Sequence, residues 1–159
     1  MALRGAAWYD GGMMDTGELR MRREDDGVTL VFVYGTLLRG EANHRRLRDA
    51  KARAATAVVE GGTLYDTGRG YPAMMLEPRP GDGNATVRGE VYEVDEATLR
   101  SLDELEDYYG PNDPRNEYER VRIEVVTEDG SLEAWTYVYK RAPAGSERIP
   151  HGDWRGRRK

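Results

Sequence analysis

The segment TLVFVYG at residues 29–35 is strongly apolar, in contrast to the charged residues that precede it. Every side chain of 29–34 is β-branched, aromatic or leucine, and the run ends at Gly35. A continuous apolar run that is bounded by glycine is typical of a buried strand. The sequence therefore predicts a buried strand over 29–34 that leads directly into a loop.

The sequence after this strand predicts two helices and further short strands. Helix formers and arginines favour a helix over 43–55 with Asn43 as N-cap, and Asp95 caps a second helix over 95–109. The remaining segments have apolar alternation or turn chemistry. They predict strands over 56–65 (with a sharp bend at Gly61–Gly62), 71–76, 86–94, 118–127 and 131–140, a Pro/Gly loop over 77–84 and a turn at 128–130.

The order of these elements favours an α+β fold, a small mixed, mostly antiparallel β-barrel with short helices. The strands are short and consecutive, the chain has 19 glycines, and no βαβ repeat is visible. A length of 159 residues suits one domain. We expect a flexible N-terminal tail over 1–27, the folded domain over 28–142 and a basic C-terminal extension over 143–159.

Composition excludes several kinds of chemistry. The chain has no cysteine, which excludes disulfides, thiolate zinc ligands and a cysteine nucleophile, and its two histidines cannot form a three-histidine zinc site. Ser101, Ser131 and Ser146 lie in no G-x-S-x-G motif. The net charge of −5 argues against nucleic acid as a partner, although the basic segment 155–159 leaves a weak nucleic-acid or membrane-surface role as an alternative. No window has the roughly 20 apolar residues of a membrane helix, and a cytoplasmic location is expected.

The loop that leaves the first strand is the first candidate site. Gly35 and Gly40 bracket the turn in Y-G-T-L-L-R-G, and glycine lets backbone N–H groups converge on a small anion. The segment has neither the lysine of a phosphate loop nor a dinucleotide fingerprint, so a carboxylate is the favoured anion. The alternative is an ordinary strand exit.

Glu106 is the candidate acid or base. At about 100° per residue, it falls between Leu99 and Leu102 on the apolar stripe of the second predicted helix, whereas Glu104 falls outside that stripe. Desolvation raises the pKa of a carboxyl toward the range useful for proton transfer. The alternative is a buried glutamate that pairs with an arginine, such as Arg120 or Arg122.

Tyr118 is the third candidate, because its hydroxyl could orient a carboxylate or another substrate group. The alternative is an aromatic plug at the start of a strand. His44 lies among arginines, which favours a surface role over a ligand role.

Five segments in order resemble the gamma-glutamylcyclotransferase-like family, in particular the gamma-glutamylamine cyclotransferases and the bacterial cyclotransferase of butirosin biosynthesis. They are Y-G-T-L at 34–37 with Arg39-Gly40 following, Y-P-A-M at 71–74, R-G-E-V-Y at 88–92, L-D-E-L-E at 102–106 and Y-E-R at 118–120. Gly152-Asp153-Trp154 is also similar to bacterial members, and the insert 107–116 is longer than in compact members.

The resemblance implies a small mixed barrel with Glu106 as catalytic acid/base. It implies that the loop of Tyr34, Gly35, Thr36 and Leu37 binds the glutamyl part of the substrate through backbone amides, and it implies neither cofactor nor metal. Tyr118, the third candidate, is expected as a further substrate contact. The reaction would be attack of the α-amine of a γ-glutamyl amide on its own γ-carbonyl, which releases 5-oxoproline and a free amine. The alternative is a non-catalytic member that binds a small ligand or a protein. The sequence identifies neither the leaving amine nor the oligomeric state.

Overall fold

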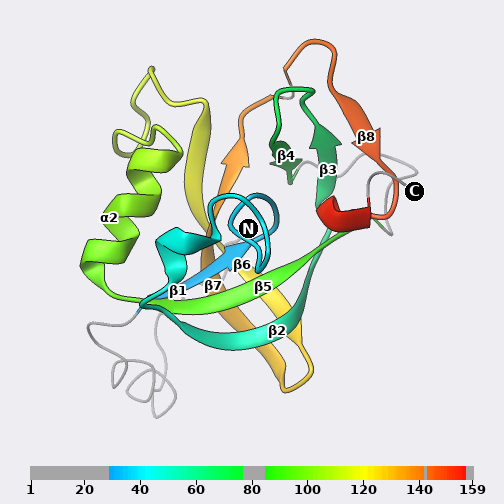
Figure 1. Ribbon diagram of the computed structural model, residues 1–159. Coiled ribbons are helices and arrows are strands. Elements are labelled where there is room, and N and C mark those ends of the chain that lie inside the picture. The colour runs from blue at the N-terminus through cyan, green and yellow to red at the C-terminus, as the bar shows by residue number, and fades with distance from the viewer. Residues whose placement is uncertain (1–28, 77–84, 142, 157–159) are drawn as a thin grey trace, which may run out of the picture.

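The structure is a computed structural model that describes residues 29–76, 85–141 and 143–156 (Figure 1). The tail expected over 1–27, the loop expected over 77–84 and the end of the basic extension at 157–159 lie outside the described residues. The strands are β1 (Thr29–Val33), β2 (Lys51–Glu60), β3 (Thr63–Asp66), β4 (Pro72–Met75), β5 (Thr86–Val94), β6 (Tyr118–Thr127), β7 (Gly130–Tyr139) and β8 (Glu147–Ile149). The helical elements are α2 (Glu96–Leu105) and two short 3-10 helices, η2 (His44–Leu47) and η3 (Trp154–Gly156).

Five of these strands close into a barrel in the order β1-β5-β2-β6-β7. Its neighbouring strands are antiparallel except where β1 meets β7, which pair in parallel through Val31 and Trp135 and so close the barrel. The predicted mixed, mostly antiparallel barrel with short helices is therefore confirmed. The predicted opening strand is also confirmed, and its side chains Val31, Phe32 and Val33 are buried in the core.

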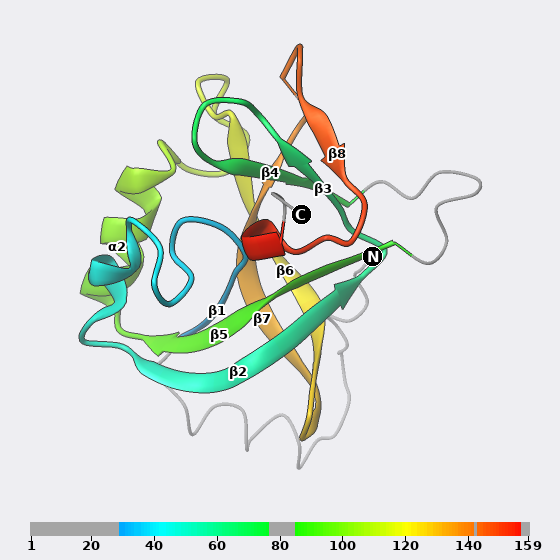
Figure 2. The ribbon, with the colours of Figure 1, turned by 45° about the vertical axis from the view of Figure 1, so that its right-hand side comes forward.

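The remaining strands form a second sheet in the order β4-β3-β8, which lies above one end of the barrel (Figures 1 and 2). The prediction of one strand over 56–65 is wrong, because the chain leaves the barrel at the bend that Gly61 makes with a φ of +86°. Residues on either side of this bend belong to different sheets. The predicted sharp bend thus connects the two sheets.

The prediction of a helix over 43–55 is wrong. Only η2 is helical there, and residues from Lys51 onward pair with β5 as part of the barrel. Helix propensity over this segment is a weak preference, and closure of the barrel requires a strand at this position. Register shifts within residues 52–57 let β2 bend around the barrel.

Helix α2 begins at the predicted cap, since the Asp95 side chain accepts a hydrogen bond from the Thr98 amide at 2.8 Å. It ends at Leu105, earlier than predicted. The Asp107 N–H donates to the Glu104 carbonyl, the next N–H donates to the Asp103 carbonyl, and Asp107 has a left-handed φ of +53°. These are the bonds of a Schellman motif, with aspartate at the position that glycine usually occupies.

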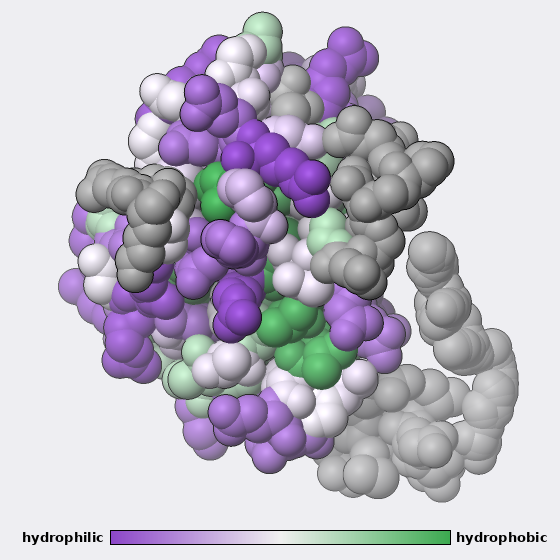
Figure 3. All heavy atoms as spheres, turned by 90° about the vertical axis from the view of Figure 1, so that its right-hand side faces the viewer, coloured by the Kyte–Doolittle hydropathy of each residue, from purple (hydrophilic) through white to green (hydrophobic). Residues whose placement is uncertain are grey.

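Residues 147–156 of the expected C-terminal extension pack against the rest of the fold. Strand β8 pairs with β3, and Trp154 is 1% exposed. The described surface is mainly hydrophilic on the face shown in Figure 3, where one hydrophobic area is visible between polar residues.

Candidate functional site

A cavity of about 370 Å³ opens where the loop after β1, the end of α2 and the start of β6 meet. Residues from all three segments that the sequence singled out contribute to its wall. They are Tyr34, Gly35, Thr36, Leu37, Glu106 and Tyr118. The fold therefore places the three candidate segments, which are distant in sequence, around one cavity.

The loop at 35–37 has its backbone carbonyls engaged and its N–H groups available. Among the described residues, no group accepts a hydrogen bond from the three N–H groups. An N–H group without an acceptor in a cavity wall is a donor for a ligand. The three carbonyls, in order, contact the Leu38 N–H at 3.0 Å, the Asn43 N–H at 2.8 Å and His44 Nδ1 at 2.9 Å.

Gly35 is required by close packing at the base of this loop. A Cβ atom on Gly35 would lie 2.5 Å from Cγ of Pro72. The proline ring cannot move aside as the end of a flexible side chain would. Pro72 therefore fixes the distance between the loop and the second sheet, which the sequence alone does not show.

Two residues that the sequence interpreted differently support the loop. The side-chain amide of Asn43 binds Oγ1 of Thr36 at 3.0 Å and makes no capping hydrogen bond to η2, so its predicted N-cap role is wrong. His44 is half-buried, with its ring 5.7 Å from that of Tyr92, and its Nδ1 contacts the loop.

Glu106 lies at the C-cap of α2 and lines the cavity as a half-buried residue, whereas Glu104 is exposed. Burial, with smaller contributions from the charges of Asp107 and Asp103, raises the pKa of the Glu106 carboxyl to about 8, and Arg46 opposes the shift. A carboxyl with this pKa exchanges its proton near neutral pH.

The arginines considered as partners of Glu106 bind other carboxylates. Arg120 pairs with Asp103 at 2.7 Å, and Arg122 pairs with Glu133 at 2.8 Å. The alternative that Arg120 or Arg122 pairs with Glu106 is therefore wrong.

The two candidate tyrosines in the cavity wall, Tyr34 and Tyr118, donate their hydroxyl protons to the backbone. Tyr34 donates to the Tyr137 carbonyl at 2.6 Å, and Tyr118 donates to the Pro72 carbonyl at 2.7 Å. Burial, and to a lesser degree the charge of Glu106, raise the pKa of both phenols, so both stay neutral. Both residues line the cavity, and the protons of their hydroxyl groups are already donated to the backbone.

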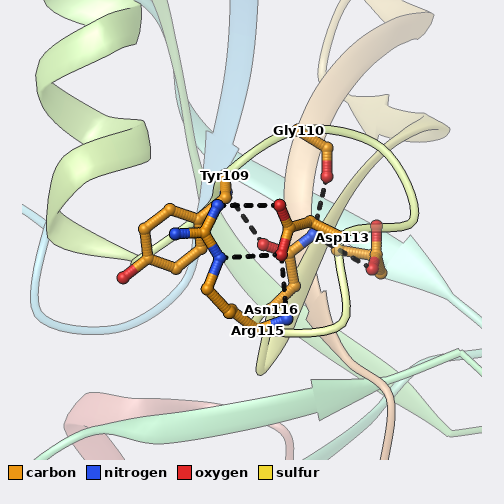
Figure 4. Close-up of polar contacts among 6 residues, drawn as sticks. Tyr109, Gly110, Asp113, Arg115 and Asn116 are labelled. Atoms are coloured by element: carbon orange, nitrogen blue, oxygen red, sulfur yellow. Dashed lines mark hydrogen bonds and ion pairs between the residues drawn. The ribbon is translucent and has the colours of Figure 1, made fainter.

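The segment between α2 and β6 forms the outer edge of the cavity, where Asp107 and Glu117 are lining residues. Asn116, which is 5% exposed, holds this segment together (Figure 4). Its side chain accepts from the Tyr109 N–H at 2.8 Å and donates to the Gly110 carbonyl at 2.7 Å.

The exposed part of this segment has its own interactions. The guanidinium of Arg115 donates two hydrogen bonds to Asp113 and lies 3.9 Å from the ring centre of Tyr109 (Figure 4). Tyr109, the last residue of the predicted second helix, is 49% exposed and lies beyond the end of α2, so the predicted end of that helix is wrong. The helix ends four residues earlier, and the stripe ends with it.

The described part of the chain contains neither a metal-binding cluster nor a membrane-spanning helix. Within it, no group of three or more His, Cys, Asp or Glu side chains is placed to hold a metal ion. None of its helices has both the length and the hydropathy needed to cross a membrane.

Comparison with known proteins gives a consistent result. The family model described as gamma-glutamyl cyclotransferase, AIG2-like, matches residues 31–156. The gamma-L-glutamyl-butirosin B gamma-glutamyl cyclotransferase of Niallia circulans is 46% identical over 111 residues, which cover 70% of this chain and 67% of that protein. The gamma-glutamylcyclotransferase family protein YtfP of Escherichia coli K12 is 37% identical, over 81% of this chain and 98% of its own. The crystal structure of an AIG2-like protein from Mus musculus superposes with a TM-score of 0.60 at 32% identity, over 73% of this chain and 80% of that one.

Proposed function

This chain belongs to the AIG2-like gamma-glutamyl cyclotransferase family, and we propose that it releases 5-oxoproline and a free amine from a γ-glutamyl amide, with Glu106 as the group that transfers the proton. The family assignment supports the reaction class. The residue roles rest on the cavity. Its decisive feature is that an ionisable carboxyl, Glu106, shares it with three backbone N–H groups that have no acceptor among the described residues.

The N–H groups of 35–37 are the proposed site of the substrate α-carboxylate. Hydrogen bonds between N–H groups and a carboxylate are charge-assisted and stronger than neutral ones. A substrate held there by its carboxylate brings its α-nitrogen and γ-carbonyl into the same cavity. Because attack is intramolecular, holding the chain in a folded shape is the main task of the protein.

The reaction needs proton transfer but no protein nucleophile. The α-nitrogen forms a bond to the γ-carbon, and the bond from that carbon to the leaving nitrogen breaks. The attacking nitrogen must lose protons and the leaving nitrogen must gain them. Glu106 carries them, accepting from the α-ammonium and then donating to the leaving amine. Its raised pKa of about 8 lies closer to that of an amine than the pKa of an ordinary glutamate does, so proton transfer between the two groups has a smaller free-energy cost.

The family assignment does not specify the leaving amine. The Niallia circulans relative is named for a γ-glutamyl derivative of butirosin B. The direct experiment incubates the purified chain with a panel of γ-glutamyl amides and detects 5-oxoproline and the released amine by mass spectrometry. Release from at least one compound supports the proposal. Binding without release from any member of the panel would instead favour a non-catalytic member of the fold.

A further inference from the structure

The segment near the C-terminus reaches back to the loop that follows β1. The guanidinium Nη2 of Arg155 donates to the backbone carbonyl of Arg39 and to Oε2 of Glu90, the latter at 2.8 Å. Arg39 is two residues beyond the N–H groups at 35–37. Figure 2 shows η3, in red, beside this loop, in blue.

Glu90 connects the same loop to the barrel. It belongs to β5, pairs in register with the last residue of β1 and is 6% exposed. Its second oxygen, Oε1, accepts from the Arg39 N–H at 3.0 Å and from the Tyr92 hydroxyl at 2.9 Å. Burial alone would raise the pKa of Glu90, but the hydrogen bonds from Arg155, Arg39 and Tyr92 outweigh it and hold the pKa below its ordinary value. The buried carboxylate is therefore ionised and fully engaged.

The motif Gly152-Asp153-Trp154 places Arg155 at this position. Gly152 has a φ of +65°, and a Cβ atom on it would lie 1.8 Å from the Thr86 carbonyl oxygen, so glycine is required for the close approach to β5. Trp154 is buried in the core, and the Asp153 side chain accepts from the Arg155 N–H at 3.1 Å. The motif has no atom in the wall of the substrate cavity, yet its geometry is tightly defined.

We propose that Glu90 and Arg155 are positioning residues that fix the carboxylate-binding loop, so that the C-terminal segment controls substrate affinity without touching the substrate. The inference rests on the proposed function of the loop. Both backbone groups of Arg39 are held by this pair. Because Arg39 follows the amides at 35–37 by two residues, these contacts restrict the movement of the loop, which lowers the ordering cost when a carboxylate binds.

The test replaces Arg155 by methionine in the full chain, with Arg53→Met as a matched control. The two arginines have side-chain exposures of 41% and 42%, and Arg53 pairs with Glu93 of the same strand, at 3.3 Å. KM, kcat and the affinity for 5-oxoproline are measured for each variant. Arg155→Lys keeps the charge and serves as the conservative variant.

We expect Arg155→Met to raise KM and weaken 5-oxoproline binding on the order of tenfold, with kcat within a few-fold of the parent. Arg53→Met should change neither, and Arg155→Lys should recover part of the loss. The preference for a substrate with an α-carboxylate over its α-carboxamide should also fall, because only the carboxylate uses the fixed amides. A merely structural role would lower the melting temperature without changing that preference.

Unchanged KM and unchanged 5-oxoproline affinity in Arg155→Met would overturn the inference. The binding measurement needs no turnover, so it separates this outcome from failure of the proposed function. A parent chain that binds 5-oxoproline but releases none from any substrate would contradict the proposed reaction. In that case the affinity of Arg155→Met for 5-oxoproline, compared with that of the parent, still tests the positioning role. If the parent neither binds 5-oxoproline nor releases it from any substrate, both proposals fail.

Discussion

Asn43 holds Thr36 through two hydrogen bonds, from its side-chain amide to the Thr36 hydroxyl at 3.0 Å and from its backbone N–H to the Thr36 carbonyl at 2.8 Å. This double contact fixes the centre of the loop at 35–37, which lines the cavity. The loop is therefore organised before a ligand arrives. Preorganised donors bind a charged group at a lower entropic cost than mobile ones.

Substitutions in the loop should separate its backbone from its side chains. Gly35→Val should weaken substrate binding severely, because a Cβ atom would lie 2.5 Å from Pro72 and the loop would have to move. Thr36→Ser keeps the hydroxyl that Asn43 binds and should leave KM within a few-fold of the parent. Steady-state kinetics on both variants, with melting temperature as a check on folding, measures the difference.

The loop should also select for the α-carboxylate. A γ-glutamyl amide whose α-carboxylate is replaced by a carboxamide should bind far more weakly, since a hydrogen bond to a charged group contributes about 1.5–3 kcal/mol. 5-Oxoproline, which keeps the carboxylate, should compete with the substrate. Equal catalytic efficiency for the carboxylate and carboxamide compounds would mean that the loop is an ordinary strand exit.

Activity should depend on pH through Glu106. With a pKa of about 8 in the free protein, the carboxyl is mostly protonated below that pH, so kcat/KM should rise with pH, reach half its maximum near 8 and level off above it. Asp107→Asn removes a neighbouring charge that raises this pKa, and asparagine tolerates the left-handed backbone at residue 107. The acidic limb of the pH profile should therefore move to lower pH in Asp107→Asn. Asp129→Asn, in the distant β6–β7 turn, is the control and should leave the limb in place.

The same carboxyl should reduce stability at neutral pH. Its pKa is raised on folding, so the unfolded state ionises from about pH 4.5 upward while the folded state does so only near pH 8. Glu106→Gln should match the stability of the parent near pH 4. Its advantage should grow as pH rises to 8, to on the order of 1 kcal/mol, because solvent at the half-buried carboxyl screens part of the effect. Denaturant unfolding at several pH values measures this trend, and a constant difference across the range would contradict the raised pKa.

The segment between α2 and β6 should depend on Asn116. Asn116→Ala leaves the Tyr109 N–H and the Gly110 carbonyl without their partner, at a cost of about 1–3 kcal/mol in unfolding free energy. Because Asp107 and Glu117 border both the segment and the cavity, KM should rise as well. Arg115→Met, which removes the exposed contacts with Tyr109 and Asp113, is the control and should have a much smaller effect on both quantities. Equal effects of the two substitutions would show that the exposed contacts hold the segment instead.

The sequence predicted most strands because apolar alternation is a local signal. It also predicted that Glu106 faces inward, although the helix ends one residue before Glu106. A residue at the C-cap still follows the last turn of the helix, so the helical angle remained a useful guide. Residues 51–55 were misassigned because pairing with β5, a tertiary requirement, overrides their helix propensity. The roles of Glu90 and Arg155 were not predictable, because they depend on a contact between residues 65 positions apart.

Turnover by Glu106→Gln is the most direct test of the account. Glutamine preserves the shape of the side chain but cannot transfer the proton, so 5-oxoproline release from a γ-glutamyl amide should fall by about 10²–10⁴-fold while the affinity for 5-oxoproline stays close to that of the parent. The result that would contradict the account is release within a few-fold of the parent rate by a folded Glu106→Gln protein.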